Sequence, residues 1–485
     1  MDFKTIQATW QRDEDMPERS WRLMMLRKVL NGQLYDQIKH SFSEEQTGAG
    51  EYIPLRKRRP SVRTNLCRTV VDDSISLLFG EDHFPTVDIK GEQKAVLGRL
   101  LKEIKLNEVM IDAATKGAVG SVAIMFSVIS DRIFLKALET EYLTPVWDPK
   151  APDTLLSVVE CYKVKGSDLK MAGYDISQDE VGSDFWFRRE WDTEKEIWYL
   201  PVKKSDTKTE FVKDDKRSVD HKLGFVPVVW VKNLPGGDDC DGASTLCGES
   251  IDCQIEIDYQ LSQVGRGLKF MSDPTLVLKQ DENGGAGAKP LVKGANNALV
   301  VPAGGDAKLL EIDGGASEAV INYVKHLREV ALENMHGNKA SNEKIAAAQS
   351  GRAMEIMNQA LIWLADRLSI SYGEGALIEL INMIFAASRK FKLIFKSGEE
   401  VGEFPEDLVP VLIWPAWYTS TTQDIMNTAN TMVRLTDSGL LTRLTAIKAL
   451  AAQFDIEDAE AESKLALAEL QARNAGAKVS ATISE

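Results

Sequence analysis

The 485-residue chain contains few cysteines, and the positions of those few exclude several classes of protein. They are Cys67, Cys161, Cys240, Cys247 and Cys253, and no two of them form a C-x-x-C pair. A disulfide-stapled secreted domain contains many more cysteines for its length, and a structural zinc site of the common type needs paired ones. We therefore expect a reduced, cytosolic setting and no such metal site.

Long apolar runs are also missing. A membrane-spanning helix needs about twenty consecutive apolar residues. The nearest candidate, Ala376 to Ala387, is shorter and contains Glu379. The N-terminal residues Met1 to Arg22 are charged and carry no apolar signal-peptide core. The sequence therefore predicts a protein without a membrane partner, in which 376–387 is part of a buried amphipathic helix.

Positive charge is not in excess. The chain has 58 Lys and Arg against 73 Asp and Glu, which gives a formal net charge of −15. A dedicated nucleic-acid-binding protein usually has a basic face, so this balance argues against one. It does not exclude a surface along which DNA slides, because a strongly basic lining would hold the phosphates instead of releasing them.

Residue patterns typical of catalysis are lacking too. No H-E-x-x-H or G-x-S-x-G motif occurs. The five histidines are scattered: His40, His83, His221, His326 and His336. The glycine-rich stretch from Gly284 to Pro290 fails as a phosphate-binding loop, because Ala288 precedes Lys289 and Pro290 follows it, where Gly and Ser or Thr are required. We therefore predict no enzyme, no cofactor and no metal site.

Helical and strand patterns alternate in blocks along the first half of the chain. Apolar residues recur at helical spacing in 21–36, 62–79 and 97–117, and Gly80 is suited to end the second helix. The apolar pattern then changes and predicts strands at 122–126, 133–135, 155–164, 186–191, 198–202 and 226–231. Asp192 to Lys195 is expected to be a hairpin turn, and the Pro-Gly and Gly-Asp steps within 234–239 close this β-rich block.

The second half is dominated by helices. Two are predicted at 249–269 and 317–335, and they enclose a small Gly-rich insert with strands at 275–279, 298–301 and 308–312. A long apolar helix is expected from 350 to 391, which would span roughly 60 Å. Short strands at 393–395 and 411–414 and helices at 427–435, 442–454 and 459–473 follow. So long a helix is unusual in a compact enzyme and suits a protein that bridges two layers of an assembly.

Two charged segments are candidates for binding. The first is the run Arg56-Lys57-Arg58-Arg59, which Arg63 and Arg68 extend. It is either a clamp for phosphate or an exposed loop that meets water or an acidic neighbouring subunit. The second, 338–349, joins two strong helices and contains Lys339 and Lys344.

Several short segments, taken in their order along the chain, carry a resemblance to a known family. They are Arg63-Thr-Asn-Leu66, Val70-Val-Asp72, Leu77-Leu-Phe-Gly80, Leu143 to Pro149, Gly224 to Val229, Ser250 to Ser262, Ser350 to Met354, Trp414 with Asp424, and Gly439 to Thr445. In this order they resemble the portal proteins of tailed bacteriophages, and in particular the subgroup typified by headful packaging. Each segment is weak alone, and the order over nearly the whole chain carries the resemblance.

The resemblance implies an α+β fold of several domains. It assigns the wing to 1–240 and 392–420, the two stem helices to 241–271 and 314–337, and a small β-rich clip to 272–313. It assigns a tunnel loop to 338–349, the long helix to 350–391, and a helical crown with the C-terminal tail to 421–485. We expect the long helix to be kinked at Gly373 and Gly375.

The resemblance also implies a function without catalysis. A ring of about twelve copies in the capsid, or about thirteen when assembled alone, would form a channel at one capsid vertex through which double-stranded DNA is packaged and later ejected. The implied partners are the large terminase subunit, head-completion or adaptor proteins, the scaffold and the major capsid protein. The implied location is the virion, with assembly in the host cytoplasm. Two alternatives stay open: a nucleotide-dependent component of the packaging enzyme, and a different oligomeric scaffold or adaptor of the virion.

Specific residues follow from these assignments. In the tunnel loop we expect Lys339, Asn342 and Lys344 to face DNA. In the clip, the residues expected to face terminase or an adaptor are Lys279, Asp281, Glu282 and Lys289. We also expect the short clip strands to pair between subunits, because three such strands make a poor sheet alone.

Overall fold

The chain folds into two compact units in a computed structural model. One unit comprises Met1–Lys339 and Ala360–Pro415, and the other comprises Ala340–Gln359 and Ala416–Glu485. The structure describes residues 2–80, 82–89, 93–205, 210–272, 275–279, 306–310, 315–337, 355–356, 358–417, 422–451, 456 and 458–469. Side chains are described at fewer of these positions.

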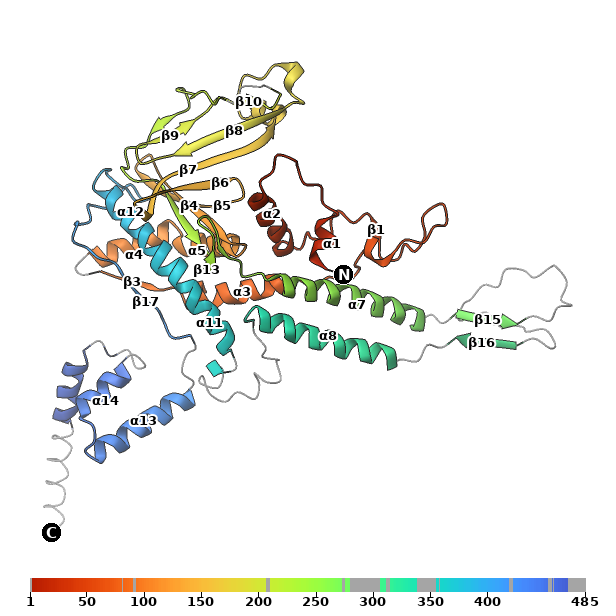
Figure 1. The fold of residues 1–485 in the computed structure, drawn as a ribbon. Helices are drawn as coiled ribbons and strands as arrows, with labels where there is room; N and C mark the ends of the chain where they lie inside the picture. Colours follow the sequence, from red (N-terminus) through yellow and green to blue (C-terminus); the bar gives the residue numbers. More distant parts are fainter. Residues whose placement is uncertain are drawn as a thin grey trace, which may run out of the picture. The chain divides into compact units, whose positions relative to one another are not determined.

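The first unit begins with short helices, the first and third of which pack against a longer helix, α7 Gly248–Ser272 (Figure 1). Their bounds, with two small paired strands, are α1 Phe3–Gln7, α2 Glu18–Leu30, β1 His40–Ser41, η1 Leu55–Lys57, β2 Arg58–Arg59, α3 Leu66–Phe79, β3 Thr86–Asp88, α4 Gln93–Glu103 and α5 Leu106–Gly117. The sequence predicts one helix over 97–117, and this prediction is wrong in one respect. The chain breaks at Lys105, whose φ of 53° is left-handed, so α4 and α5 are separate helices.

Two antiparallel sheets form the β-rich part. The first has the order β12-β4-β5, from β4 Ser121–Ile129, β5 Arg132–Glu139 and β12 Val228–Lys232. The second has six strands in the order β11-β9-β8-β7-β6, with β10 beside β8. Its bounds are β6 Leu143–Asp148, β7 Ala151–Lys165, β8 Asp184–Trp191, β9 Lys195–Trp198, β10 Val202–Lys203 and β11 Val219–Asp220. The hairpin turn predicted at 192–195 is confirmed, because the Asp192 amide donates to the Lys195 carbonyl.

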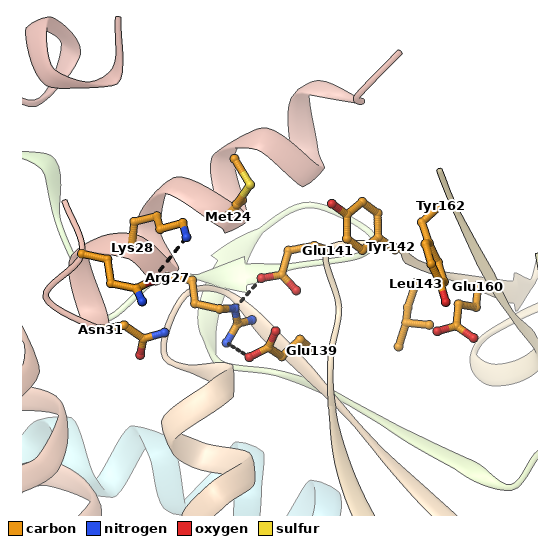
Figure 2. Close-up of a pocket in the computed structure, with 11 residues that line it drawn as sticks. Met24, Arg27, Lys28, Asn31, Glu139, Glu141, Tyr142, Leu143, Glu160 and Tyr162 are labelled. Carbon is orange, nitrogen blue, oxygen red and sulfur yellow. Dashed lines mark hydrogen bonds and ion pairs between the residues drawn. The ribbon is translucent and has the colours of Figure 1, made fainter. Parts of the chain in front are cut away.

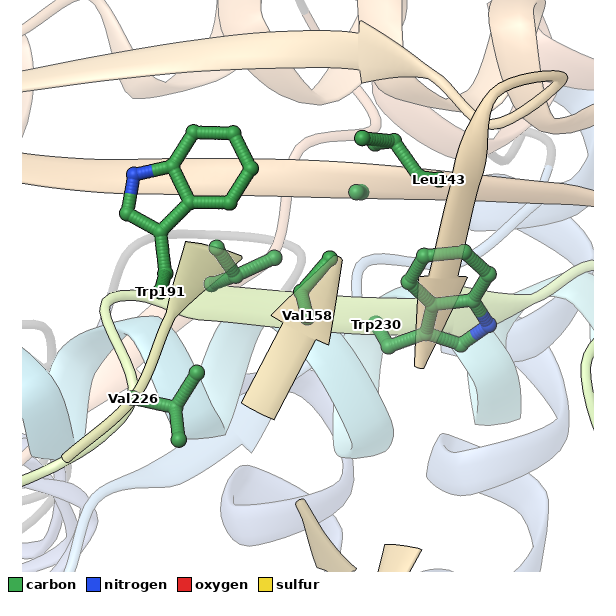
Figure 3. Close-up of a cluster of buried hydrophobic side chains, with 7 residues drawn as sticks. Leu143, Val158, Trp191, Val226 and Trp230 are labelled. Carbon is green, nitrogen blue, oxygen red and sulfur yellow. The ribbon is translucent and has the colours of Figure 1, made fainter. Parts of the chain in front are cut away.

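The two sheets meet at a buried apolar cluster (Figure 3). Trp191, Val158 and Leu143 come from the six-stranded sheet and pack with Trp230 of β12 and with Val226. The Trp230 indole nitrogen donates a 2.7 Å hydrogen bond to the Cys240 carbonyl, so its polar atom is satisfied. The cluster therefore fixes the two sheets relative to each other.

A long helix packs across the three-stranded sheet and α5. It consists of α11 Gln359–Leu368, the π-helical segment η3 Ser369–Leu377 and α12 Ile378–Ser388. Gly373 and Gly375, where the sequence predicts a kink, lie within the run of π-helix, in which the ladder of hydrogen bonds shifts by one residue. The bend itself stays a prediction. The helix ends at Ser388, three residues earlier than the sequence predicts, and 350–354 lie outside the described residues.

This helix is the one in the described chain that is long and apolar enough to cross a membrane by length and composition. More than half of its most apolar window is buried within the protein. Leu377, Leu380, Ile381 and Ile384 are fully buried in the core. The helix is therefore a core element, which agrees with the buried helix that the sequence predicts for 376–387.

The remaining elements of the first unit include the two helices that extend from it. The bounds are α6 Gly166–Met171, η2 Gln178–Glu180, β13 Leu234–Gly237, β14 Gly242–Ala243, α7 Gly248–Ser272, β15 Thr275–Lys279, β16 Asp306–Leu310, α8 Gly315–Asn334 and β17 Val411–Ile413. Strand β17 pairs with β3 and confirms the late strand. In the second unit, α13 Thr422–Asp437, α14 Arg443–Leu450 and residues 459–469 are helical, as predicted.

Candidate functional site

The predicted site residues lie almost entirely outside the described residues. This holds for Lys339, Asn342 and Lys344 of the tunnel loop. It also holds for Asp281, Glu282 and Lys289 of the clip, and for the glycine-rich stretch 284–290. Lys279 is the last residue of β15, where its backbone pairs with Asp306 of β16. The roles of all seven residues therefore stay predictions.

Two helices frame these segments. α7 and α8 pack side by side, and the antiparallel strands β15 and β16 follow at one end (Figure 1). At the other end, the Ser250 hydroxyl of α7 donates to the Ala331 carbonyl of α8. β16 begins two residues before the strand predicted at 308–312. The third predicted strand, 298–301, lies outside the described residues.

α8 has little cover outside one row of side chains. Between Glu318 and Val330 no side chain is fully buried, and those most covered recur at helical spacing: Val320, Val324, Leu327 and Val330. Ile321 is 41% exposed and Tyr323 is 45% exposed, although both are large apolar side chains. In contrast, the first half of α7 is buried against α1 and α3.

The buried half of α7 carries a stripe of polar side chains. They are Ser250, Gln254, Asp258 and Ser262, spaced four residues apart and each at most 3% exposed. Such spacing places them on one side of a helix. We call these four residues the polar stripe.

Every member of the polar stripe bonds to another part of the chain. Besides the bond of Ser250 to α8, the Cys67 amide of α3 donates to Gln254 Oε1 at 3.0 Å, and the Val62 amide donates to Ser262 Oγ at 3.0 Å. The polar stripe therefore fixes the rotation of α7 against the N-terminal region, because a rotated helix would leave buried donors unpaired.

Asp258 is the most connected member. Its Oδ1 accepts hydrogen bonds from the Thr64 amide at 2.6 Å and the Thr64 hydroxyl at 2.7 Å, and its Oδ2 accepts one from the Tyr35 hydroxyl at 2.8 Å. Burial raises the pKa of Asp258 to about 6, although the bonds from Thr64 and Tyr35 act in the opposite direction. Burial, with the nearby Asp258 carboxylate, also raises the pKa of Tyr35.

A second buried carboxylate holds the segment just before α7. Asp241 accepts two 2.8 Å hydrogen bonds from the Arg19 guanidinium and one of 2.6 Å from the Ser121 hydroxyl. Arg22 adds a 3.0 Å ion pair from the same helix, α2. A bidentate pair of this kind fixes orientation as well as distance, so α2 is held against the β13–β14 hairpin that precedes α7.

A cavity of about 450 Å³ lies between α2 and the sheets (Figure 2). In it Arg27 forms ion pairs with Glu139 and Glu141, and Lys28 donates to Gln33 at 3.3 Å. A third carboxylate on the lining, Glu160, is paired with Arg189. Each of these carboxylates therefore has an arginine partner, and the charges that line the cavity are paired within the chain.

The described residues contain neither a cluster of metal ligands nor a disulfide. No group of three or more His, Cys, Asp or Glu side chains among those residues is arranged to hold a metal ion. All five cysteines are free.

Sequence reasoning did not single out Asp258 or Asp241. A partial signal for the first was present, because polar residues recur every four positions at 250, 254, 258 and 262, but Asp252, Glu256 and Gln260 recur at the same spacing on another side of the helix. No comparable signal marks Asp241, whose partners Arg19 and Ser121 are more than a hundred residues away in sequence.

The chain was compared with curated proteins, solved structures and protein families. No curated protein matches the chain. A chain in a solved structure described as "Neck of empty GTA particle computed with C6 symmetry" is similar at a TM-score of 0.39 and 10% identity, over 80% of this chain and 88% of that one. At that TM-score the similarity carries no argument. The family model described as "Phage portal protein, SPP1 Gp6-like" matches residues 12–476. Because that match spans nearly the whole chain, the protein belongs to the SPP1 Gp6-like family of phage portal proteins.

Proposed function

We propose that copies of this chain form a ring around a channel at one vertex of the capsid, through which double-stranded DNA is packaged and ejected. Membership in a phage portal family supports a structural role in the phage particle. The observation that carries the proposal is the poorly covered face of α8, where Ile321 and Tyr323 stay exposed in the single chain. In a ring, each copy presents one face to a different face of the next, and such a contact would cover them.

The wing, stem, clip and crown boundaries belong to the same proposal. α7 and α8 would be the stem, 272–313 the clip, 338–349 the tunnel loop and 421–485 the crown. The clip would dock the large terminase subunit and later a head-completion protein, while scaffold and major capsid protein would meet the outside of the ring. Assembly would take place in the host cytoplasm. Energy for DNA movement would come from the terminase, which makes the chain a conduit without catalysis.

The test is electron microscopy of the purified full-length protein, with end-on views. Rings of about twelve or thirteen copies around a hole are expected. Monomers that persist when scaffold protein is co-expressed would contradict the proposal. ATP turnover by the purified protein would instead favour the packaging-enzyme alternative, and an oligomer without a through-hole would favour a scaffold or adaptor.

We further propose that Lys339, Asn342 and Lys344 face the channel and contact DNA transiently. An overall acidic channel would let DNA slide, and a few cations per subunit would slow the DNA through transient phosphate contacts without binding it tightly. The double variant Lys339→Ala, Lys344→Ala should change the length or retention of packaged DNA. Unchanged length and retention would show that these lysines have no such role.

A further inference from the structure

A basic cleft lies between the loop that joins α2 to α3 and the outer half of α7. Its volume is about 990 Å³. Four cations line it, Arg59 and Arg63 from the loop and Arg266 and Lys269 from α7, and one carboxylate, Glu45. The structure thus gathers positive charge at this place, although the whole chain carries a net charge of −15.

The basic run singled out in the sequence divides into two groups of residues. Arg58 is only 1% exposed, and its Nε donates to the Ile53 carbonyl at 2.9 Å. Arg68 is paired with Asp72 on α3 at 2.7 Å. These two arginines are committed to the fold, so a ligand would meet Arg56, Lys57, Arg59 and Arg63.

The second group is poorly neutralised by the described residues. Arg56, Lys57 and Arg59 form no ion pair with any of them, and Arg63 has one long contact, 3.9 Å, with Asp36. Glu45 is engaged by Arg266 and, at 3.8 Å, by Arg58. The cations of the loop therefore outnumber the carboxylates near them, which favours an external anion.

The cleft is held in place before any ligand arrives. Ser41 pairs with Arg59 between β1 and β2, and the Tyr259 hydroxyl of α7 donates to the Arg58 carbonyl at 2.9 Å. The Val62 amide donates to Ser262 of the polar stripe. A rigid cleft loses little conformational entropy when it binds, so even a few contacts can count.

The chemistry of the lining fits phosphate oxygens. Guanidinium groups bind phosphate in two parallel hydrogen bonds, and the exposed hydroxyls of Ser43 and Ser61 on the same lining are further phosphate donors. Arg56 and Lys57, which precede the cleft residue Arg59 in the chain, are exposed as well. Several cations in one short segment suit a repeating polyanion.

We propose that this basic cleft binds the sugar–phosphate backbone of double-stranded DNA. The choice of DNA as the polyanion rests on the proposed function of the chain as a DNA conduit. Binding is independent of base sequence and sensitive to salt, because it consists of phosphate contacts. The site adds a DNA contact outside the tunnel loop. Because the rest of the chain is acidic and repels the phosphates, DNA would be attracted at the cleft alone.

The test is fluorescence anisotropy of a labelled DNA duplex with the full-length protein, read separately on monomer and ring fractions. The triple variant Lys57→Gln, Arg59→Gln, Arg63→Gln should bind at least about 10-fold more weakly at low salt. Between about 50 and 200 mM salt its log–log salt slope should be shallower by about two to three. Because DNA binding is measured on both fractions, a variant that does not form rings can still be tested for binding.

A matched control removes as much charge elsewhere. The variant Lys94→Gln, Arg99→Gln, Lys105→Gln changes three exposed cations of the α4 region and should bind within about twofold of wild type. Equal binding by wild type and the cleft variant overturns the proposal, as does equal loss in the control.

If the cleft variant unfolds, a second variant keeps the test open. Arg59→Lys with Arg63→Lys keeps the charge and should keep most of the binding, so its complete loss of binding also counts against a phosphate site. Should a poly-glutamate peptide bind the cleft while DNA does not, the occupant is an acidic protein segment and the DNA proposal is wrong.

Discussion

At the scale of single residues, buried polar side chains determine how α7 sits against the N-terminal region. Asp258 is fully buried and accepts three hydrogen bonds, so it is both well satisfied and costly to ionise. Its removal and its neutralisation should therefore have different effects. Alanine would strand the Thr64 and Tyr35 donors, whereas asparagine could keep partners for both.

The first prediction uses the raised pKa of Asp258, about 6 against an ordinary 3.8. The folded state holds the proton more tightly than the unfolded chain, so the contribution of this carboxyl to stability is fully present below about pH 4 and is lost as pH rises through about 6. The resulting cost near neutral pH is about 3 kcal/mol. Asp258→Asn carries no such cost, so its Tm relative to wild type should increase from about pH 4 to pH 7.

The control for this prediction is Gln263→Asn, which exchanges one neutral side chain for another at an exposed position of α7. Its Tm difference from wild type should stay nearly constant over the same pH range, because neither side chain titrates. A Tm difference for Asp258→Asn that does not vary with pH would contradict the assignment.

The second prediction concerns a close approach between α5 and η3. A Cβ at Gly117 would lie 2.0 Å from the Tyr372 hydroxyl oxygen and 3.1 Å from Val122 Cγ1. Tyr372 cannot move easily, since it is fully buried and donates to Asn233 Oδ1 at 3.1 Å. Gly117→Ala should therefore destabilise the fold by about 3 kcal/mol, measured by urea unfolding.

A matched glycine is available on the neighbouring helix. Gly98 lies inside α4, and nothing is within 4 Å of its Cβ position. Gly98→Ala should stabilise the protein by about 0.5–1 kcal/mol, since alanine is the better helix former. Equal effects of the two substitutions would show that packing against Tyr372 is not what requires glycine at 117.

At the scale of elements, the sequence predicted most helices and strands of the described chain, and its errors have physical causes. The break between α4 and α5 falls at Lys105, which has a left-handed conformation. The residue there is not a glycine or asparagine, the types that favour this conformation, so the sequence does not indicate the break. The π-helical turn of η3 depends on tertiary partners. A Cβ at Gly373 would lie 2.4 Å from the Trp414 ring. The spacing of apolar residues along the helix contains no information about such a tertiary contact.

The candidate site was less predictable than the fold. Regular spacing reveals which face of a helix is buried, but in α7 it does not separate the polar stripe from Asp252, Glu256 and Gln260, which recur at the same interval. The Asp241–Arg19 pair joins residues 222 apart in sequence, and a single sequence contains no sign of that pairing. The tunnel-loop and clip residues came from family resemblance, and their roles stay predictions because they lie outside the described residues or, for Lys279, because only the backbone is described.

The third prediction belongs to the insert between the stem helices. β15 and β16 pair with each other within the chain, and α7 and α8 pack along their own length, so the helices do not depend on 273–313 for their contacts. Replacing Ser272 to Asp313 by a short Gly-Ser linker should abolish terminase docking and leave the helix pair folded. Pull-down of terminase and far-ultraviolet circular dichroism measure the two results, and normal docking by the deletion protein would refute the clip assignment.

At the scale of the whole molecule, the single chain leaves α8 incompletely covered. A helix that is partly apolar and mostly exposed gains stability when a neighbour covers it. Ile321 and Tyr323 flank the row of side chains that face α7, so both are placed to meet neighbours on either side of the helix pair. Burying each would contribute about 1–2 kcal/mol per contact, which a closed ring multiplies by the number of copies.

The fourth prediction follows from this arithmetic. Ile321→Asp with Tyr323→Asp places charges where neighbouring copies would meet, so ring formation should be lost or require at least about 10-fold higher protein concentration. The monomer should remain folded with a Tm within a few degrees of wild type, because both side chains are already more than 40% exposed. Native mass spectrometry measures assembly, and differential scanning calorimetry measures the Tm.

The control is Asn322→Asp, at an exposed position between the two. It adds charge without removing apolar surface, so this variant should still assemble. Normal rings from the double variant would mean that this face of α8 lies away from the subunit contacts, and the ring would then have to be held together by the wing or the crown.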